Sequence, residues 1–272
     1  MKNGNGNGHH VKEGRVSVSP AVAQRWLSMN LNNRALRPTH VEALARDMRE
    51  GRWLYNGDPI RFDKNGDLID GQHRLHAVIL SGKTIDFLVV RGLESRVQET
   101  IDIGSKRTAA DALRLRGITN SNETAAIVRK FILWETGKRW HFSNFKVTSP
   151  QVTELMDADP DFHVAAEKAV RYRNTIPVPP SVIGFTWLIF SKIDREVAEQ
   201  FFEQLGTGAD LSNGHPVLTL RNRLVGLRNE SGRIKDERLI GTICRAWNAH
   251  REGRKLHRLQ VETESDVFPE PV

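Results

Sequence analysis

The stretch that decides the fold is residues 68–77, which read Leu-Ile-Asp-Gly-Gln-His-Arg-Leu-His-Ala. Before it, an Asn-Gly dipeptide at residues 65–66 favours the positive φ angles of a tight hairpin turn. After it, apolar residues recur with helical spacing as far as Gly82, which favours a left-handed helix end. We therefore expect a strand that gives way at Gly71 to a short helix over residues 72–81.

The start of this helix is a candidate anion-binding site. Gln72, His73 and Arg74 lie in its first turn, directly after Asp70 and Gly71. The first N–H groups of a helix have no partner within it, and the helix dipole adds partial positive charge there, so phosphates bind such positions. The alternative is an ordinary Asp-Gly turn in which Arg74 is a solvated cation and the histidines have no ligand.

Composition indicates a globular chain and excludes several classes. Of its 272 residues, 39% are hydrophobic and 27% are charged, and the length favours two domains. A single cysteine, Cys244, excludes a disulfide framework and a Cys-based zinc cluster, which is typical of the reducing cytoplasm. The most apolar window, residues 182–190, is too short to span a bilayer, so we expect a cytoplasmic protein without a membrane partner.

The positive charge of the chain points to DNA. The net charge is +7 and the pI is near 9.7, which favours a polyanionic partner. Residues 217–260 hold eleven Lys and Arg against four Asp and Glu, a surplus equal to that of the whole chain. The DNA contacts that we expect from this window are Arg221, Arg223, Arg251, Arg254 and Lys255.

Secondary-structure signals divide the chain into a mixed front part and a helical back part. Strand patterns occur near residues 15–18, 60–63 and 85–90, whereas only helical patterns follow Gly117. We expect those helices over residues 123–136, 149–156, 162–172, 180–193, 196–205, 216–228 and 235–252. The expected domains are a disordered tail at residues 1–14, a mixed domain at 15–116, a basic all-helical domain at 117–260 and a loose acidic tail at 261–272.

A second polar segment, residues 99–108, precedes an Ala-rich helix expected over residues 109–115. A loop with Gly104, two cations and two hydroxyl groups just before a helix is able to bind phosphate. The alternative is a helix cap in which a hydroxyl group satisfies the first N–H groups and the cations are solvated. The side chains concerned are Ser105, Lys106, Arg107 and Thr108.

Five features follow one another in the front part of the chain. They are Arg37, a helix that ends at Gly51, a Pro-Ile strand at residues 59–60, the Asp-Gly-Gln-His-Arg motif at 70–74 and the apolar strand at 85–90. In this order they resemble the N-terminal domain of the ParB and sulfiredoxin superfamily, whose members with this motif are often labelled nucleases. The resemblance implies an α+β fold: a small mixed-sheet N-terminal domain followed by an all-α C-terminal domain.

The resemblance also implies a nucleotide, CTP in ParB and ATP in sulfiredoxin, bound with Mg²⁺ over the motif helix. Asp102 and Arg107 take the place of the carboxylate and the cation in the Glu-Asn-x-x-Arg motif of ParB, although the spacing differs and the Asn is missing. We therefore assign Mg²⁺ to Asp70 and Asp102. The residues that we assign to the nucleotide are Gly71, Gln72, His73, Arg74, Ser105, Lys106, Arg107 and Thr108.

Sulfiredoxin chemistry and chromosome segregation are not implied. Sulfiredoxin needs a catalytic Cys in its phosphate motif, where this chain has His73, and Cys244 lies far away in the helical part. The back part also lacks a ParB-type helix-turn-helix and the usual dimerisation tail.

Three functions remain open. The first is a ParB-like nucleotide-binding protein that acts on DNA, with slow NTP hydrolysis. The second is a metal-dependent DNA nuclease or phosphotransferase at the same centre, with Asp70 as a metal ligand, His73 or His76 as the general base and Arg74 stabilising the phosphate. The third is a DNA-binding scaffold whose nucleotide site has decayed. The sequence leaves open the preferred nucleotide and whether the protein is a homodimer.

Overall fold

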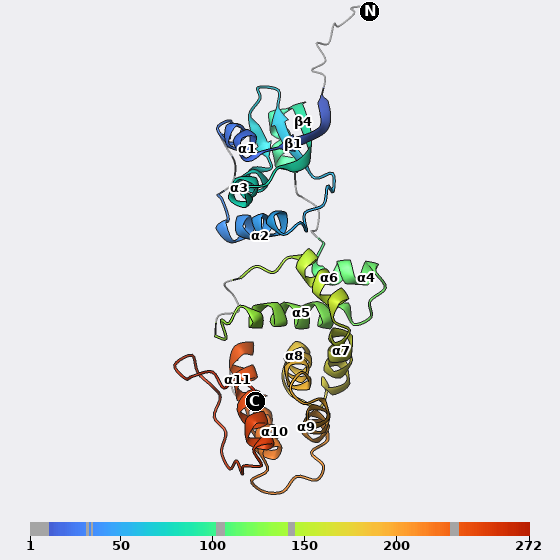
Figure 1. The fold of residues 1–272 in the computed structure, drawn as a ribbon, viewed down its shortest axis with the longest axis vertical. Helices are drawn as coiled ribbons and strands as arrows, with labels where there is room; N and C mark the ends of the chain where they lie inside the picture. Colours follow the sequence, from blue (N-terminus) through green and yellow to red (C-terminus); the bar gives the residue numbers. More distant parts are fainter. Residues whose placement is uncertain (1–10, 31–32, 34, 102–106, 141–144, 229–233) are drawn as a thin grey trace, which may run out of the picture. The chain divides into compact units, whose positions relative to one another are not determined.

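The computed structural model describes residues 11–30, 33, 35–101, 107–140, 145–228 and 234–272. The chain divides into two compact units between Arg107 and Thr108, the first containing the sheet and the second only helices (Figure 1). The expected α+β class is thus confirmed. The division falls nine residues before the boundary expected after residue 116, because the helix that follows Thr108 packs against other helices of the second unit.

The N-terminal unit is a four-stranded mixed sheet with three α-helices. Its strands follow the order β1-β4-β2-β3, with β1 antiparallel to β4, β2 parallel to β4 and β3 antiparallel to β2. The elements are β1 (Lys12–Val18), α1 (Pro20–Leu27), α2 (Pro38–Arg49), β2 (Pro59–Asp63), β3 (Leu68–Asp70), α3 (Gln72–Ser81), β4 (Ile85–Leu93) and the 3₁₀ helix η1 (Ser95–Thr100).

Local signals explain most of these elements. The Ser19 hydroxyl accepts the N–H of Val22 and caps α1, and Gly82 ends α3 in the left-handed conformation. The strand β1 begins at Lys12, so the tail expected over residues 1–14 is wrong from Lys12 onward, because pairing with β4 orders this segment. Residues 1–10 of that expected tail lie outside the described residues.

The register of the sheet places four residues in one row on the same face. Glu13 of β1 lies opposite Val90 of β4, Val90 lies opposite Arg61 of β2, and Arg61 lies opposite Asp70 of β3. Ile60 belongs to the neighbouring row and is fully buried on the opposite face, in the core of the unit. Directly paired residues share a face of a sheet, so Arg61 and Asp70 lie on the face away from this core.

In its described residues the C-terminal unit has helices and no strand, as expected, and is built around one apolar helix. All residues from 182 to 190 in α8 are buried, and the ring of Phe190 stacks on that of Trp247 with centroids 4.3 Å apart. The helices are α4 (Ala109–Leu115), α5 (Ser121–Glu135), α6 (Ser149–Ala158), α7 (Asp161–Tyr172), α8 (Pro180–Ser191), α9 (Arg195–Thr207), α10 (Pro216–Arg228) and α11 (Asp236–Arg251).

The loose tail expected over residues 261–272 is also wrong. Glu262 is only 4% exposed, and its carboxylate accepts a hydrogen bond of 2.9 Å from Arg245 on α11. Phe268 is buried and contacts the ring of Trp140. These contacts join residues far apart in the sequence, so the acidic, Pro-containing composition of the tail did not reveal them.

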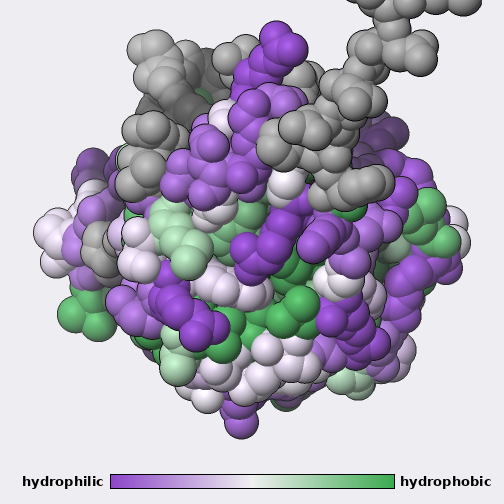
Figure 2. Space-filling view, turned by 90° about the horizontal axis from the view of Figure 1, so that it is seen from above, coloured by the Kyte–Doolittle hydropathy of each residue, from purple (hydrophilic) through white to green (hydrophobic). Residues whose placement is uncertain are grey.

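The surface carries scattered apolar side chains among many polar ones. The largest exposed examples include Leu54 in the N-terminal unit and Leu115 in the C-terminal unit, and isolated exposed apolar residues are normal. The face drawn in Figure 2 is mostly hydrophilic, with hydrophobic residues in smaller areas between. Within the described ranges, no helix combines the length and the apolar character needed to cross a bilayer.

Candidate functional site

The strand-to-helix junction lies where the sequence predicted it. Gly71 has a φ of +107° and is the N-cap of α3, a conformation that residues with a Cβ rarely adopt. A Cβ at this position would also lie 2.5 Å from Cδ1 of Ile60. The glycine is therefore required here, both by its own backbone and by the packing of α3 on β2.

Two arginines share one carboxylate oxygen beside this junction. Arg61 donates from Nη1 to Oδ2 of Asp70 at 2.5 Å, and Arg74 donates from Nη2 to the same oxygen at 2.9 Å. The Asp58 carboxylate lies 3.7 Å from Nη1 of Arg74 and is largely exposed. We call Arg61, Asp70 and Arg74 the Asp70 cluster. Its side chains are 28%, 17% and 15% exposed, respectively.

Arg61 was not among the residues predicted for the site. The signal that was available is the hairpin register, since Arg61 lies directly opposite Asp70 across the turn. Two guanidinium groups meet on the Asp70 carboxylate, and the exposed Asp58 carboxylate lies near Arg74 as a second counter-charge. Charge-assisted contacts of this kind are strong, and they occupy Oδ2 of Asp70, so this oxygen is not an open ligand for a cation.

The two histidines of the motif differ in their surroundings. His73 is 7% exposed, and its Nε2 accepts the backbone N–H of Arg37 at 3.1 Å, so Nε2 carries no proton in this arrangement. Its ring also lies near that of His40, with centroids 5.5 Å apart. His76 is half-buried, and burial lowers its pKa, which keeps the imidazole neutral near pH 7. A catalytic role for either histidine stays a prediction.

A network of amide side chains fixes the start of α3. Asn30 donates to Oε1 of Gln72 at 3.1 Å. Asn33 donates to the carbonyl oxygen of Leu68 at 2.7 Å and accepts from Nε2 of Gln98 at 3.0 Å. Gln72, assigned to the nucleotide, is thus a buried member of this network. The network links the segment between α1 and α2, and also η1, to the motif. No sequence pattern indicated it, because its members are distant in the chain.

The second predicted phosphate segment is described only at its end. Asp102, Ser105 and Lys106 lie outside the described residues, and Arg107 is exposed. Thr108 is the cap of α4: its hydroxyl accepts the N–H of Asp111 at 3.2 Å, and the Asp111 carboxylate accepts the N–H of Thr108 at 2.9 Å. The described residues contain no group of three His, Cys, Asp or Glu side chains able to hold a metal.

The arginines predicted to contact DNA are largely engaged inside the C-terminal unit. Arg221 donates from Nη1 to the carbonyl oxygens of Leu205 and Gly206 near the end of α9. Arg254 donates to the Glu252 carboxylate at 2.6 Å.

The remaining predicted DNA contacts differ in how they are engaged. Arg251 is exposed and lies 3.7 Å from the Asp194 carboxylate, and Arg223 is half-buried. Lys255 is exposed, and within the described part of the chain no carboxylate pairs with it. Lys255 is therefore the predicted DNA contact most available to a phosphate.

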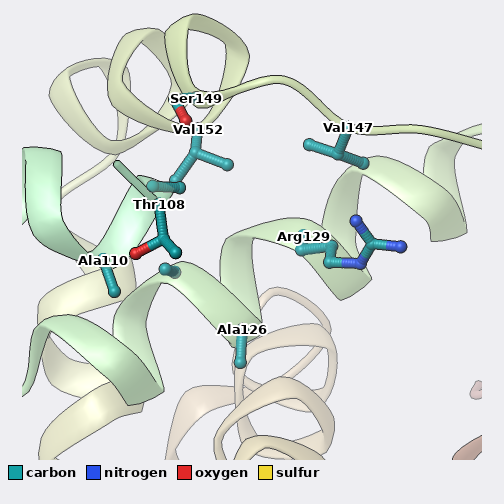
Figure 3. A pocket seen from close by; sticks show the side chains of 9 residues that line it. Thr108, Ala110, Ala126, Arg129, Val147, Ser149 and Val152 are labelled. Carbon is teal, nitrogen blue, oxygen red and sulfur yellow. The ribbon is translucent and has the colours of Figure 1, made fainter. Parts of the chain in front are cut away.

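The helical unit also contains a pocket, of whose lining residues only Thr108 was predicted to bind a ligand. Its volume is about 350 Å³, and it lies among α4, α5 and α6. Figure 3 shows short apolar side chains around it, with the Arg129 guanidinium on the side of Val147. The lining residues are Thr108, Ala109, Ala110, Ala125, Ala126, Arg129, Val147, Ser149 and Val152.

The single thiol of the chain belongs to none of the groups described above. Cys244 is fully buried in α11, and burial raises its pKa well above the ordinary value. A buried thiol of this kind is unreactive.

None of the known protein-family models matches this chain, and no curated protein or solved structure matches it. The strongest functional signal in the molecule is accordingly its own geometry at the Asp70 cluster.

Proposed function

We propose that the N-terminal unit is a ParB-like nucleotide-binding domain and that the chain acts on DNA, with slow NTP hydrolysis. The ligand proposed is CTP or ATP, with its phosphates over the start of α3. The observation that supports this most is the Asp70 cluster, in which Arg61 and Arg74 converge on one oxygen beside Gly71.

In this proposal, Oδ2 of Asp70 occupies the place that a phosphate oxygen of the nucleotide takes when it binds. A phosphate oxygen that replaces Oδ2 of Asp70 gains two guanidinium groups that are already oriented. Gly71 is itself buried, and Ile60 fills the place where its Cβ would lie, so the proposal rests on the two guanidinium groups and not on an open backbone. The released Asp70 carboxylate then turns toward solvent, from which its side chain is not fully excluded.

Mg²⁺ does not fit the described residues as a site of its own. Oδ2 of Asp70 already accepts two hydrogen bonds from arginines, and Asp102 lies outside the described residues. Mg²⁺ is commonly bound through one or two carboxylates plus substrate phosphates. We therefore propose only that Mg²⁺ binds together with the triphosphate.

The nuclease or phosphotransferase alternative keeps one supporting observation. His76 lies in the same helix, and burial lowers its pKa, so its neutral form is able to accept a proton near pH 7. Plasmid incubated with Mg²⁺ or Mn²⁺ tests this alternative. Nicking by the wild type that disappears in His76→Gln would favour it, and nicking that persists in the variant would assign the activity to another group.

The test of the nucleotide proposal is removal of Arg74. In calorimetry with ATP, CTP, GTP and UTP, each with and without Mg²⁺, Arg74→Ala should weaken binding of the preferred nucleotide about 10-fold or more, since a hydrogen bond to a charged group contributes about 1.5–3 kcal/mol. Lys83→Ala is the matched control, because Lys83 follows the opposite end of the same helix. Equal affinities of wild type and Arg74→Ala for all four nucleotides would overturn the proposal.

A further inference from the structure

The strand β1 presents an open edge of the sheet. It is the terminal strand in the order β1-β4-β2-β3, and no other strand of the described chain pairs with its outer side. Residues 12–17 are all exposed, whereas Val18 at the end of the strand is buried. An exposed strand edge carries backbone N–H and C=O groups that are able to pair with another strand.

The charges along this edge alternate in sign around a glycine. Lys12, Glu13, Gly14, Arg15 and Val16 follow one another. Among the described residues, Glu13 has no ion-pair partner in its own chain, whereas Arg15 donates from Nε to the Asp86 carboxylate at 2.9 Å. The guanidinium of Arg15 is still largely exposed, so it is able to meet a second carboxylate.

Gly14 has no evident role in the fold of its own chain. Its φ is not positive, and a Cβ added there would meet no atom within 4 Å. Glycine weakens a strand interior and often marks a place where another backbone approaches closely. In β1 that approach is available only from the open side, because β4 occupies the other side.

We propose that β1 pairs in an antiparallel direction with β1 of a second copy of this chain, about a two-fold axis at Gly14. Glu13 then lies opposite the partner's Arg15, and Arg15 lies opposite the partner's Glu13. The two glycines face each other at the axis. Lys12 lies opposite the partner's Val16, where its alkyl chain covers an exposed apolar side chain.

The charges select this register over its neighbours. An axis at Arg15 would oppose two arginines, and an axis at Glu13 would oppose two glutamates. Like charges directly opposite each other destabilise a strand pair, and opposite charges stabilise it. An axis between two residues would pair side chains from opposite faces of the strand, which an antiparallel pair does not allow.

The pairing would join the two sheets into one of eight strands with both candidate sites on the same side. A two-fold axis perpendicular to the sheet keeps each face of the sheet on its own side. Arg61 and Asp70 lie in the same row and on the same face as Glu13. The two Asp70 clusters therefore lie on the same side of the joined sheet.

Reciprocal charge reversal on the full-length chain tests the register. In a dimer of the Glu13→Arg variant, two pairs of positive side chains face each other across the axis. In a dimer of the Arg15→Glu variant, two pairs of negative side chains do. Each variant should raise the dissociation constant of the dimer at least 10-fold in sedimentation equilibrium. Mixed in equal amounts, the two variants should associate with each other, because every facing pair is again of opposite sign. The double variant E13R/R15E should dimerise with itself.

Lys12→Glu is the matched control, since it changes the charge of β1 as much as Arg15→Glu but faces Val16 across the axis. It should dimerise within about 3-fold of the wild type. A monomeric wild type would overturn the proposal and would mean that the charges protect the edge from pairing. Dimers that are insensitive to Glu13→Arg would equally overturn it. A lack of association in the mixture, with both variants folded by circular dichroism, would reject this register.

Discussion

The two units of the chain use their arginines in different ways. In the helical unit, Arg254 pairs with a neighbouring carboxylate and Arg221 donates to carbonyl oxygens of α9. In the N-terminal unit, Arg61 and Arg74 share the single carboxylate of Asp70. The basic window of residues 217–260 lies in the helical unit, but that unit as a whole holds 23 Lys and Arg against 21 Asp and Glu, whereas residues 1–107 hold 17 against 12. A charge surplus in a sequence window therefore does not show how its cations are engaged; the contacts of each side chain do.

The cores of the two units differ as well. The helical unit is centred on the stacked rings of Phe190 and Trp247, both fully buried. The N-terminal unit has a smaller core, in which Trp26 meets Phe62 edge to face at 5.2 Å, and it also buries polar side chains such as Gln72 and His73. Stability and the candidate site are thus concentrated in different units, and each should respond to different substitutions.

The largest expected effect separates the stabilities of the units. Trp247→Ala removes a fully buried ring and should lower the free energy of unfolding of the helical unit by about 3–5 kcal/mol. Calorimetric unfolding should show one transition moved to lower temperature, with nucleotide affinity unchanged. Trp26→Ala is the counterpart in the other unit and should move the other transition. A single transition that both variants shift equally would show that the two units do not unfold separately.

A smaller effect is expected at the start of α3. Gly71→Ala forces a side chain into a backbone with φ of +107° and against Ile60, and should destabilise the N-terminal unit by about 1–3 kcal/mol. Gly82→Ala is the control, because its φ is also positive but a Cβ there would meet nothing within 4 Å. Urea unfolding should find Gly71→Ala the more damaging of the two. Equal losses would mean that contact with Ile60 is unimportant.

Acid should weaken the helical unit through a histidine pair. His215 and His250 lie with ring centroids 5.5 Å apart. Burial lowers the pKa of both, and the charge of His215 further lowers the pKa of His250. The unfolded chain binds protons at these two histidines more readily than the folded chain does. The free energy of unfolding is therefore unaffected by them above pH 6.5 and falls as the pH drops below it, by at most about 1.4 kcal/mol per pH unit and proton. Thermal unfolding from pH 7.5 to 5 should show a shallower loss in His250→Asn than in the wild type or in the control His163→Asn, and equal slopes in all three would contradict this.

The smallest expected effect concerns DNA. Removal of one phosphate contact lowers the slope of log affinity against log salt by about 0.9. Lys255→Ala should show this change, whereas Arg254→Ala should show less, because Glu252 already pairs with Arg254. A salt titration of binding to a DNA duplex measures both slopes. Identical slopes for Lys255→Ala and the wild type would place the DNA surface elsewhere.

Local signals in the sequence predicted most elements of the fold. The Ser19-Pro20 start of α1 and the Gly82 end of α3 were predicted from short-range chemistry and are present. The apolar spacing of the C-terminal half likewise predicted its helices. Such signals act within a few residues, and they are therefore readable from a single sequence.

Features that depend on distant residues were not predicted. Arg61 joins the candidate site through cross-strand pairing with Asp70, and Glu262 is buried because Arg245 neutralises it. The motif itself was located correctly, but its polar side chains were expected to face a ligand, whereas His73 accepts a hydrogen bond from Arg37. Only the three-dimensional arrangement decides which partner each polar group takes.

The helix α8 has a consequence for how the chain must be made. Its residues 182–190 are buried all round, yet the ring that stacks on Phe190 belongs to α11, more than 50 residues later in the sequence. During synthesis this apolar segment leaves the ribosome well before α11, which covers it, has been made. Exposed apolar surface of this kind promotes aggregation. A nascent chain arrested after α8 would therefore be a substrate for chaperones, whereas one extended through α11 would not.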